Sequence, residues 1–323
     1  MAVKKHVLPL ILSALVLWYF SGDDDHVDHG PLTCRGQSLQ LQDKVIIVTG
    51  ANRGIGYQVS LELARRGVRL VMGCRDPWSA RAARDKIVKI TNNTRVSIIG
   101  LDLARMKHVS TFVWNFRDKF EFDHVDVIIN NAAATPDNDQ RQETSEGLEK
   151  IMATNYLGPV HLTKSLIPLL SEEGLVINIV DNITHITDNN VDNINSDMSY
   201  NSRDIYSRSK HYLHSITRTM WEQWSVPVYA VYPCQVLTSL HYSGSLSHRL
   251  SSWLLWSVSP LLGQSGVREA GRTVVWLAGG GAEAGDQGST WHSCEKVTSH
   301  DHLENNEQLW KKTQELIKKA LHS

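Results

Sequence analysis

The sequence predicts an α/β fold with a doubly wound, mainly parallel sheet in a single domain. Two observations support this prediction. Segments typical of strands alternate with segments typical of helices from residue 44 to the end of the chain. An apolar run at 45–48 also leads through a glycine-rich turn into a helical pattern. Such alternation indicates βαβ units, which place parallel strands in one sheet and helices on both of its faces.

The predicted elements follow one another at regular intervals. After the first strand, at 45–49, apolar strand segments lie at 68–73, 96–101, 125–130, 175–180, 226–232 and 289–294. Helical patterns lie between and after them at 78–91, 106–120, 145–171, 203–224, 267–279 and 304–321. We expect the domain to span 44–300, after a polar linker at 23–43, with a C-terminal helix within 301–323.

The turn TGANRGIG at 49–56 predicts a dinucleotide site of the Rossmann type. Its glycines (Gly50, Gly54 and Gly56) permit a tight turn, close approach of the backbone to a pyrophosphate, and close packing of helix on strand. The N-terminus of the following helix offers free N–H groups to the phosphates. A purely structural glycine turn is the competing interpretation.

Composition narrows the class of protein. The chain has 323 residues, 41% of them hydrophobic and 21% charged, which is enough for a sizeable core. A net charge of −1 disfavours nucleic acid as a partner. The four cysteines (Cys34, Cys74, Cys234 and Cys294) lack CxxC spacing, so no zinc site is predicted. Free thiols are the favoured interpretation, and a disulfide stays open if the domain is luminal.

The amino terminus resembles a targeting segment. An apolar run at 7–20 follows Lys4 and Lys5 and precedes an acidic stretch at 23–25. It is shorter than the ~20 residues of a usual membrane span. We favour an uncleaved anchor within 1–22 over a cleaved signal, which would give a secreted protein. The flanking charges and the sequon at 92–94 favour a luminal domain.

Three further motifs follow in order: NNAA at 130–133, TNYLGP around Asn155, and Tyr206-Ser-Arg-Ser-Lys210. Together with the glycine turn they resemble the classical short-chain dehydrogenase/reductase family over residues 40–300. GCRDP at 73–77, LDL at 101–103 and the N-terminal anchor resemble its membrane-anchored retinol dehydrogenase group. This resemblance implies an oxidoreductase with an NAD(P)(H) coenzyme, a location in the endoplasmic reticulum or another endomembrane, and a possible homodimer.

Tyr206 and Lys210 are the predicted catalytic pair. At i and i+4 they share one face of a helix. An ammonium beside a phenol lowers the pKa of the phenol and makes it a usable acid or base near neutral pH. The resemblance implies that Lys210 also binds the ribose, and that Asn155 supports Lys210 through a water.

Charge predicts the coenzyme. Cys74 stands where NAD enzymes usually place an acid, and Arg53 and Arg75 lie nearby. Guanidinium groups suit a 2′-phosphate, so NADP(H) is favoured, while Asp76 keeps NAD(H) open. The full set of predicted coenzyme residues, several of them implied only by the resemblance, is Thr49, Gly50, Asn52, Arg53, Gly54, Ile55, Gly56, Arg75, Asp102, Leu103, Asn130, Ala132, Tyr206, Lys210, Pro233, Val236 and Thr238.

The sequence departs from the family pattern at Asp181, which stands at the position of the catalytic serine. A serine hydroxyl donates a hydrogen bond to a substrate carbonyl, whereas a carboxylate only accepts. Three interpretations stay open: a protonated Asp181 that donates, replacement of the hydroxyl by Thr184, or weak or absent activity. Ala133 and Cys234 replace glycines and would crowd the nicotinamide if their turns needed positive φ.

The stretch 238–262 is where the family forms its substrate lid. Trp253 and Trp256 give it an apolar surface suited to a hydrophobic substrate or a membrane face. No histidine grouping indicates a metal site. We therefore predict an NADP(H)-dependent oxidoreductase that interconverts an apolar, retinoid- or steroid-like alcohol and its carbonyl. A catalytically weakened coenzyme-binding protein that acts through interaction is the alternative.

Overall fold

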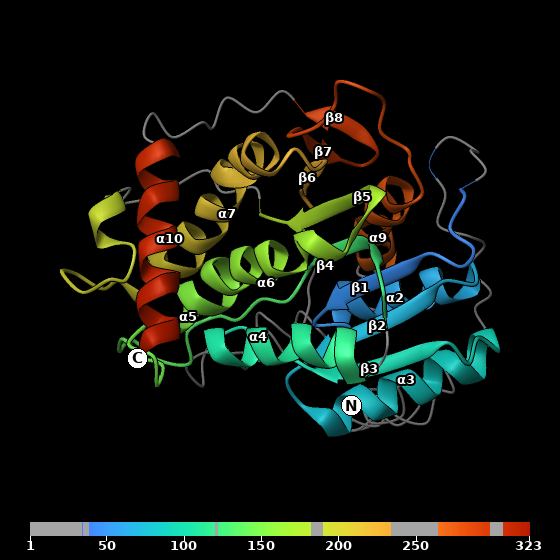
Figure 1. The fold of residues 1–323 in the computed structure, drawn as a ribbon, viewed down its shortest axis with the longest axis horizontal. Coiled ribbons are helices and arrows are strands. Elements are labelled where there is room, and N and C mark those ends of the chain that lie inside the picture. The colour runs from blue at the N-terminus through green and yellow to red at the C-terminus, as the bar shows by residue number, and fades with distance from the viewer. Residues whose placement is uncertain (1–33, 35–38, 120–121, 182–189, 234–263, 298–305) are drawn as a thin grey trace, which may run out of the picture.

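The computed structural model describes residue 34 and residues 39–119, 122–181, 190–233, 264–297 and 306–323. Its centre is one eight-stranded sheet with the order β3-β2-β1-β4-β5-β6-β7-β8 (Figure 1). The strands are β1 (Val45–Thr49), β2 (Arg69–Cys74), β3 (Val96–Gly100), β4 (Val125–Asn130), β5 (Leu170–Ile179), β6 (Val228–Val231), β7 (Thr290–His292) and β8 (Glu295–Val297). Neighbouring strands from β3 to β7 pair in parallel, which confirms the predicted fold class.

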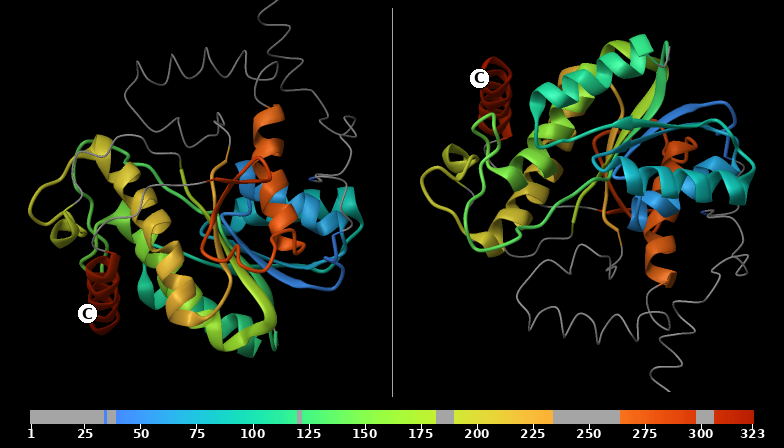
Figure 2. Two further views of the ribbon diagram at one scale, coloured as in Figure 1. Left: turned by 90° about the horizontal axis from the view of Figure 1, so that it is seen from above. Right: turned by 90° about the horizontal axis from the view of Figure 1, so that it is seen from below.

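Helices cover both faces of the sheet (Figure 2). On one face lie α2 (Gly54–Arg65), α3 (Pro77–Thr91) and α9 (Gln264–Ala278). On the other lie α4 (Met106–Trp114), α6 (Gly158–Leu166), α7 (Ser202–Trp224) and α10 (Asn306–His322). Side chains alternate along β1, so Ile46 and Val48 join the first layer while Val45 and Ile47 join the second. The expected C-terminal helix is α10, which packs on α7 and α4.

Two predicted boundaries were wrong. The chain turns back after β7 and adds β8 in antiparallel pairing, where only one strand was expected. The predicted helix at 145–171 is broken into α5 (Lys150–Met152), the π-helical turn η3 (Ala153–Leu157), α6 and the 3-10 turn η4 (Ile167–Leu169). β5 then begins at Leu170, earlier than expected.

The break in this helix has a local cause. Pro159 lies in the first turn of α6 and has no N–H to donate to the preceding turn. Gly158 packs closely on the backbone oxygen of Leu103, and a Cβ there would collide with that oxygen. A wider π turn joins α5 to α6 across this point, and it carries Asn155. Two further short turns are η2 (Asn115–Lys119), which continues α4, and η5 (Val191–Asn193).

The glycine turn between β1 and α2 is packed against the end of β4. Gly50 has a φ of +64°, and its Cβ would lie 2.9 Å from the Cα of Ala132. A Cβ on Gly56 would lie 2.5 Å from the carbonyl oxygen of Gly50 and would overlap the amide of Asn131. Both positions therefore need glycine, the first for its φ and the second for space alone.

Asn131 joins the two strand ends beside this turn. Its side-chain nitrogen donates to the carbonyl oxygens of Thr49 at 2.8 Å and Gly50 at 3.3 Å. The Thr49 hydroxyl oxygen accepts from the backbone N–H groups of Asn131 and Ala132, each at 3.0 Å. These bonds fix the spacing between the β1–α2 turn and the loop after β4.

Two of the four cysteines are paired, so the expectation of free thiols was wrong for them. A disulfide joins Cys34 to Cys294, with the Cα atoms 6.1 Å apart. Cys34 is 3% exposed, and Cys294 lies in the turn between β7 and β8. Cys74 is free and buried. Cys234 lies outside the described residues.

The predicted anchor at 7–20 also lies outside the described residues. Within the described part of the chain, no helix is both long enough and apolar enough to cross a membrane.

Substitution of Gly56 by Ala tests the packing of the glycine turn. Overpacking costs about 1–3 kcal/mol, and this exceeds the ~1 kcal/mol that Ala gains over Gly inside a helix. We expect a lower free energy of unfolding in urea. Gly100→Ala is the control, because a Cβ there would meet only the ring of His108 at 3.9 Å. Equal unfolding midpoints for the two variants would contradict this account.

Candidate active site

The candidate site lies at the carboxyl edge of the sheet. The strand order reverses between β1 and β4, and in open α/β sheets such a reversal opens a crevice at the carboxyl ends of the strands. The glycine turn follows β1 there, and Asn131 and Asp181 follow the ends of β4 and β5. The fold therefore gathers residues from distant parts of the sequence at one edge.

Asn155 and Ser209 link three elements at this edge. The Asn155 side-chain oxygen accepts from the backbone N–H of Ala134 at 2.8 Å, and its nitrogen donates to the Ala134 carbonyl at 2.9 Å. The same nitrogen donates to the Ser209 hydroxyl at 3.0 Å. That hydroxyl donates to the backbone carbonyl of Tyr206 at 2.7 Å. The turn η3, the loop after β4 and the first turns of α7 are thereby held in one network.

The Tyr206 hydroxyl donates a hydrogen bond to an Asp181 carboxylate oxygen at 3.2 Å. The serine position and the tyrosine of the predicted catalytic pair thus lie together, as expected. Burial and the nearby Asp181 charge raise the pKa of Tyr206 well above its ordinary value. The expectation that Lys210 lowers this pKa was therefore wrong. Desolvation of the phenol, the Asp181 charge and the hydrogen bond to Asp181 all act in this direction.

Lys210 lies inside the site and bonds to the sheet. It is 3% exposed, and its ammonium donates to the carbonyl oxygen of Ile179 at 2.8 Å. Burial lowers the pKa of Lys210 to about 8, and the Asp181 charge partly opposes this shift. The ammonium is thus held at the end of β5, next to Asp181. Its predicted role toward a ribose stays a prediction.

The Asn130 side chain lies in the core and not on the coenzyme side of the edge. It is 1% exposed and donates to the hydroxyl of Thr163 at 3.0 Å and to the side-chain oxygen of Asn178 at 2.9 Å. Asn178 in turn donates to Thr217 at 3.1 Å. This buried chain joins α6, β4, β5 and α7. The whole residue is buried, and its role toward a coenzyme stays a prediction.

The residues predicted to select the coenzyme lie at the end of β2 and in the glycine turn. Arg53 and Arg75 are exposed, and neither forms a salt bridge with a described residue. Burial raises the pKa of the Cys74 thiol to about 11, so it is neutral near pH 7. The Asp76 carboxylate caps α3 by accepting from the backbone N–H groups of Trp78 and Ser79. The Ser79 side chain, followed by these backbone N–H groups, lowers the pKa of Asp76, and the bonds hold its carboxylate at the start of the helix.

The other predicted residues divide into two groups. Asp102 follows β3 and accepts from the N–H of Ala104 at 3.1 Å, and the Asn52 amide donates to the Ser79 hydroxyl at 3.0 Å. The remaining described ones lie in α2 or in the loops that follow β3, β4 and β6; they are Gly54, Ile55, Leu103, Ala132 and Pro233. Ala133 has no positive φ, so the expected backbone strain there is absent. Thr184, Cys234, Val236, Thr238, Trp253 and Trp256 lie outside the described residues.

Three residues of the site were not predicted from the sequence. Asn131 fixes the glycine turn, Ser209 links Asn155 to α7, and Asn178 extends the buried chain of amides. The second asparagine of NNAA was the available signal for Asn131. Ser209 and Asn178 carry no comparable signal, because their bonds depend on how η3, β5 and α7 pack.

Comparison with known proteins identifies the family to which this chain belongs. The family model described as short chain dehydrogenase matches residues 44–245. The chain therefore belongs to the short-chain dehydrogenase/reductase family, and it is an oxidoreductase of the kind that acts on CH–OH donors.

Two of the similar proteins are retinol dehydrogenases. The chain is 30% identical to retinol dehydrogenase 12 of Bos taurus, covering 96% of this chain and 98% of that protein. It is 31% identical to retinol dehydrogenase 13 of Homo sapiens, covering 81% and 80% respectively. A solved structure of an uncharacterised protein from Mycobacterium Paratuberculosis has a TM-score of 0.66 at 21% identity, covers 87% of this chain and 95% of that chain, and supports the fold alone.

The buried Lys210 predicts a pH dependence of stability. Its folded-state pKa of about 8 lies below the ordinary value, so between about pH 8 and 10 the unfolded chain binds more protons than the folded one. Wild type should therefore gain stability with rising pH in this window relative to Lys210→Met, which lacks the titrating group. Urea unfolding of both proteins across the window measures this. A constant difference between them would contradict the burial of a charged Lys210.

Proposed function

We propose that this protein is an NADP(H)-dependent oxidoreductase that reduces an apolar carbonyl to its alcohol. The observation that carries the proposal is the hydrogen-bond network at the carboxyl edge that joins Asn155 through Ser209 to Tyr206, with Lys210 bonded to the end of β5. Tyr206 would serve as the acid, Lys210 would bind the ribose, and Asn155 would support the pair.

The described residues fit a dinucleotide carrying a 2′-phosphate. The glycines at 50 and 56 let the turn pack against the end of β4, and the N–H groups at the start of α2 would face a pyrophosphate. Arg53 and Arg75 offer positive charge near the end of β2, where the neutral Cys74 does not repel a phosphate. Asp76, the acid that kept NAD(H) open, has its carboxylate engaged at the start of α3. When bound, the coenzyme supplies the hydride.

The protonation of Tyr206 favours the reductive direction. A phenol whose pKa is raised stays protonated near neutral pH and has a proton to give to a carbonyl oxygen. Oxidation of an alcohol would need the phenolate instead. A retinoid or steroid is the proposed substrate class, because the relatives are named retinol dehydrogenases and the stretch 238–262 contains Trp253 and Trp256.

A second candidate function is supported by the Asp181 contact. The Tyr206 hydroxyl donates its hydrogen bond to the Asp181 carboxylate, whereas a carbonyl substrate would need that proton for its own oxygen. An ionised Asp181 would also repel the negative charge that develops on the substrate oxygen. Loss of one donor at such a position costs about 2.7–4 kcal/mol in other enzymes. On this basis the protein would bind the coenzyme, catalyse the redox reaction slowly and act mainly by interacting with other molecules.

The location and assembly also remain proposals. The apolar run at 7–20 would anchor the protein in the endoplasmic reticulum or another endomembrane, and a secreted form after signal cleavage is the alternative. A homodimer is proposed by family resemblance.

Coenzyme selectivity is tested by replacing both arginines. We expect Arg53→Gln/Arg75→Gln to weaken NADPH binding about 10- to 100-fold, because a hydrogen bond to a charged group contributes roughly 1.5–3 kcal/mol. NADH binding should change little, since NADH has no 2′-phosphate. Fluorescence titration measures both affinities. Arg84→Gln, which removes an exposed arginine paired with Asp85 on α3, is the control. Equal loss for the two coenzymes would exclude a 2′-phosphate site.

Turnover is tested with NADPH and a panel of apolar aldehydes and ketones that includes retinaldehyde. Tyr206→Phe should reduce the rate about 10²- to 10⁴-fold, because it removes the acid. Asp181→Ser should raise kcat about 10²- to 10³-fold by restoring a donor. The control Asp181→Asn removes the charge and retains a side-chain oxygen that accepts from Tyr206. Wild-type turnover comparable to that of Asp181→Ser and abolished by Tyr206→Phe would reject the second candidate, and turnover seen only in Asp181→Ser would support it.

A further inference from the structure

The disulfide between Cys34 and Cys294 bears on the compartment of the domain. Both residues are buried, at 3% and 8% exposure. Cys294 is held by α9, since its backbone N–H donates to the Thr273 hydroxyl at 3.0 Å. Disulfides persist in oxidising compartments and are rare in the cytosol. Cys34 follows the apolar run at 7–20 in the sequence, so the domain would lie beyond that run on an oxidising side.

A second feature, independent of the disulfide, is the sequon Asn92-Asn93-Thr94 between α3 and β3. Asn92 ends α3 in the left-handed conformation, with φ 55° and ψ 11°, and is exposed. Thr94 is exposed as well. With a threonine two positions on, this asparagine has the pattern of an N-glycosylation acceptor.

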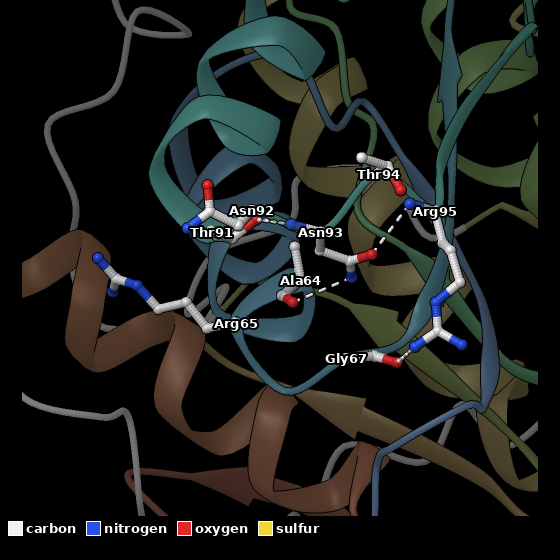
Figure 3. Close-up of a pocket in the computed structure, with 8 residues that line it drawn as sticks. All are labelled: Ala64, Arg65, Gly67, Thr91, Asn92, Asn93, Thr94 and Arg95. Atoms are coloured by element: carbon white, nitrogen blue, oxygen red, sulfur yellow. Dashed lines mark hydrogen bonds between the residues drawn. The ribbon is translucent and has the colours of Figure 1, made fainter.

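The middle residue of the sequon holds the turn in place. The Asn93 amide donates to the carbonyl oxygens of Ala64 at 3.0 Å and Val68 at 2.9 Å, and its oxygen accepts from the N–H of Arg95 at 2.9 Å. Figure 3 shows this side chain directed toward the end of α2, while the Asn92 amide points away from it. The acceptor is therefore presented outward from an ordered turn.

The position of Asn92 is compatible with an active site that stays open. Asn92 precedes β3, so it lies at the amino edge of the parallel sheet. The glycine turn, Asp181 and Tyr206 lie at the carboxyl edge. An oligosaccharide on Asn92 would leave the molecule from the edge opposite the coenzyme and substrate.

From these two features we infer that the domain faces the lumen of the secretory pathway and that Asn92 carries an N-linked oligosaccharide. Disulfide formation and N-glycosylation need the same side of the membrane. The inference does not depend on the proposed function, because neither feature touches the candidate active site.

The test expresses the full chain in animal cells and compares its electrophoretic mobility before and after digestion with peptide-N-glycosidase. A second sequon, Asn182-Ile183-Thr184, follows Asp181 in the sequence, so the comparison is made in a Thr184→Ala background. We expect a glycosidase-sensitive shift that Thr94→Ala removes and that the matched variant Thr94→Ser retains. Insensitivity to the glycosidase, or a shift that persists in Thr94→Ala, would overturn the glycan on Asn92.

The orientation is tested on the same protein without any substitution in the domain. Cells are treated with a thiol-alkylating reagent before lysis, and the chain is digested without reductant. Recovery of one linked peptide that contains both Cys34 and Cys294 would support the luminal orientation. Recovery of both cysteines in alkylated form, as separate peptides, would overturn it.

Discussion

The close approach of the β1–α2 turn to the end of β4 is the contact on which the other features of this edge depend. Gly56 has no room for a side chain because the Gly50 carbonyl and the Asn131 amide occupy that space. Asn131 and Thr49 then exchange hydrogen bonds that fix the distance between the two strand ends. A dinucleotide site of this type needs close packing of the glycine turn on the strand ends, and the lack of side chains at 50 and 56 allows that packing.

The part of the site around Tyr206 and Lys210 depends on the charges of its side chains rather than on close packing. Tyr206, Lys210 and Asp181 are brought together by β5 and α7, and Asp181 affects the ionisation of the other two. Asp181 raises the pKa of Tyr206 and also opposes the fall in the pKa of Lys210. One carboxylate at the serine position therefore favours a protonated phenol and a charged ammonium at the same time.

The sequence predicted the parallel sheet and the place of the glycine turn, because both depend on local periodicity and on residue types with few alternatives. It also placed Asp181 at the serine position, and the structure shows that this residue contacts Tyr206. It did not predict the direction of the Tyr206 pKa shift, since burial cannot be read from an i, i+4 spacing. It assigned Asn130 to the coenzyme side, whereas the structure buries that side chain and directs Asn131 to the glycine turn. The sequence alone does not show which of two adjacent asparagines points into the core. The break in the helix at η3 and the additional strand β8 also depend on tertiary packing, which the sequence alone does not show.

The π turn at Ala153–Leu157 has one more consequence, and it concerns tolerance to change in length. A π turn contains one residue more than the α-helical turn it replaces. Loss of a single residue from this turn would require a tighter turn directly before Pro159, which has no N–H to donate to it, and would shift Asn155 relative to α6. The Asn155 amide would then no longer meet Ala134 and Ser209. The widened turn therefore acts as a spacer, and this stretch should accept substitutions more readily than deletions.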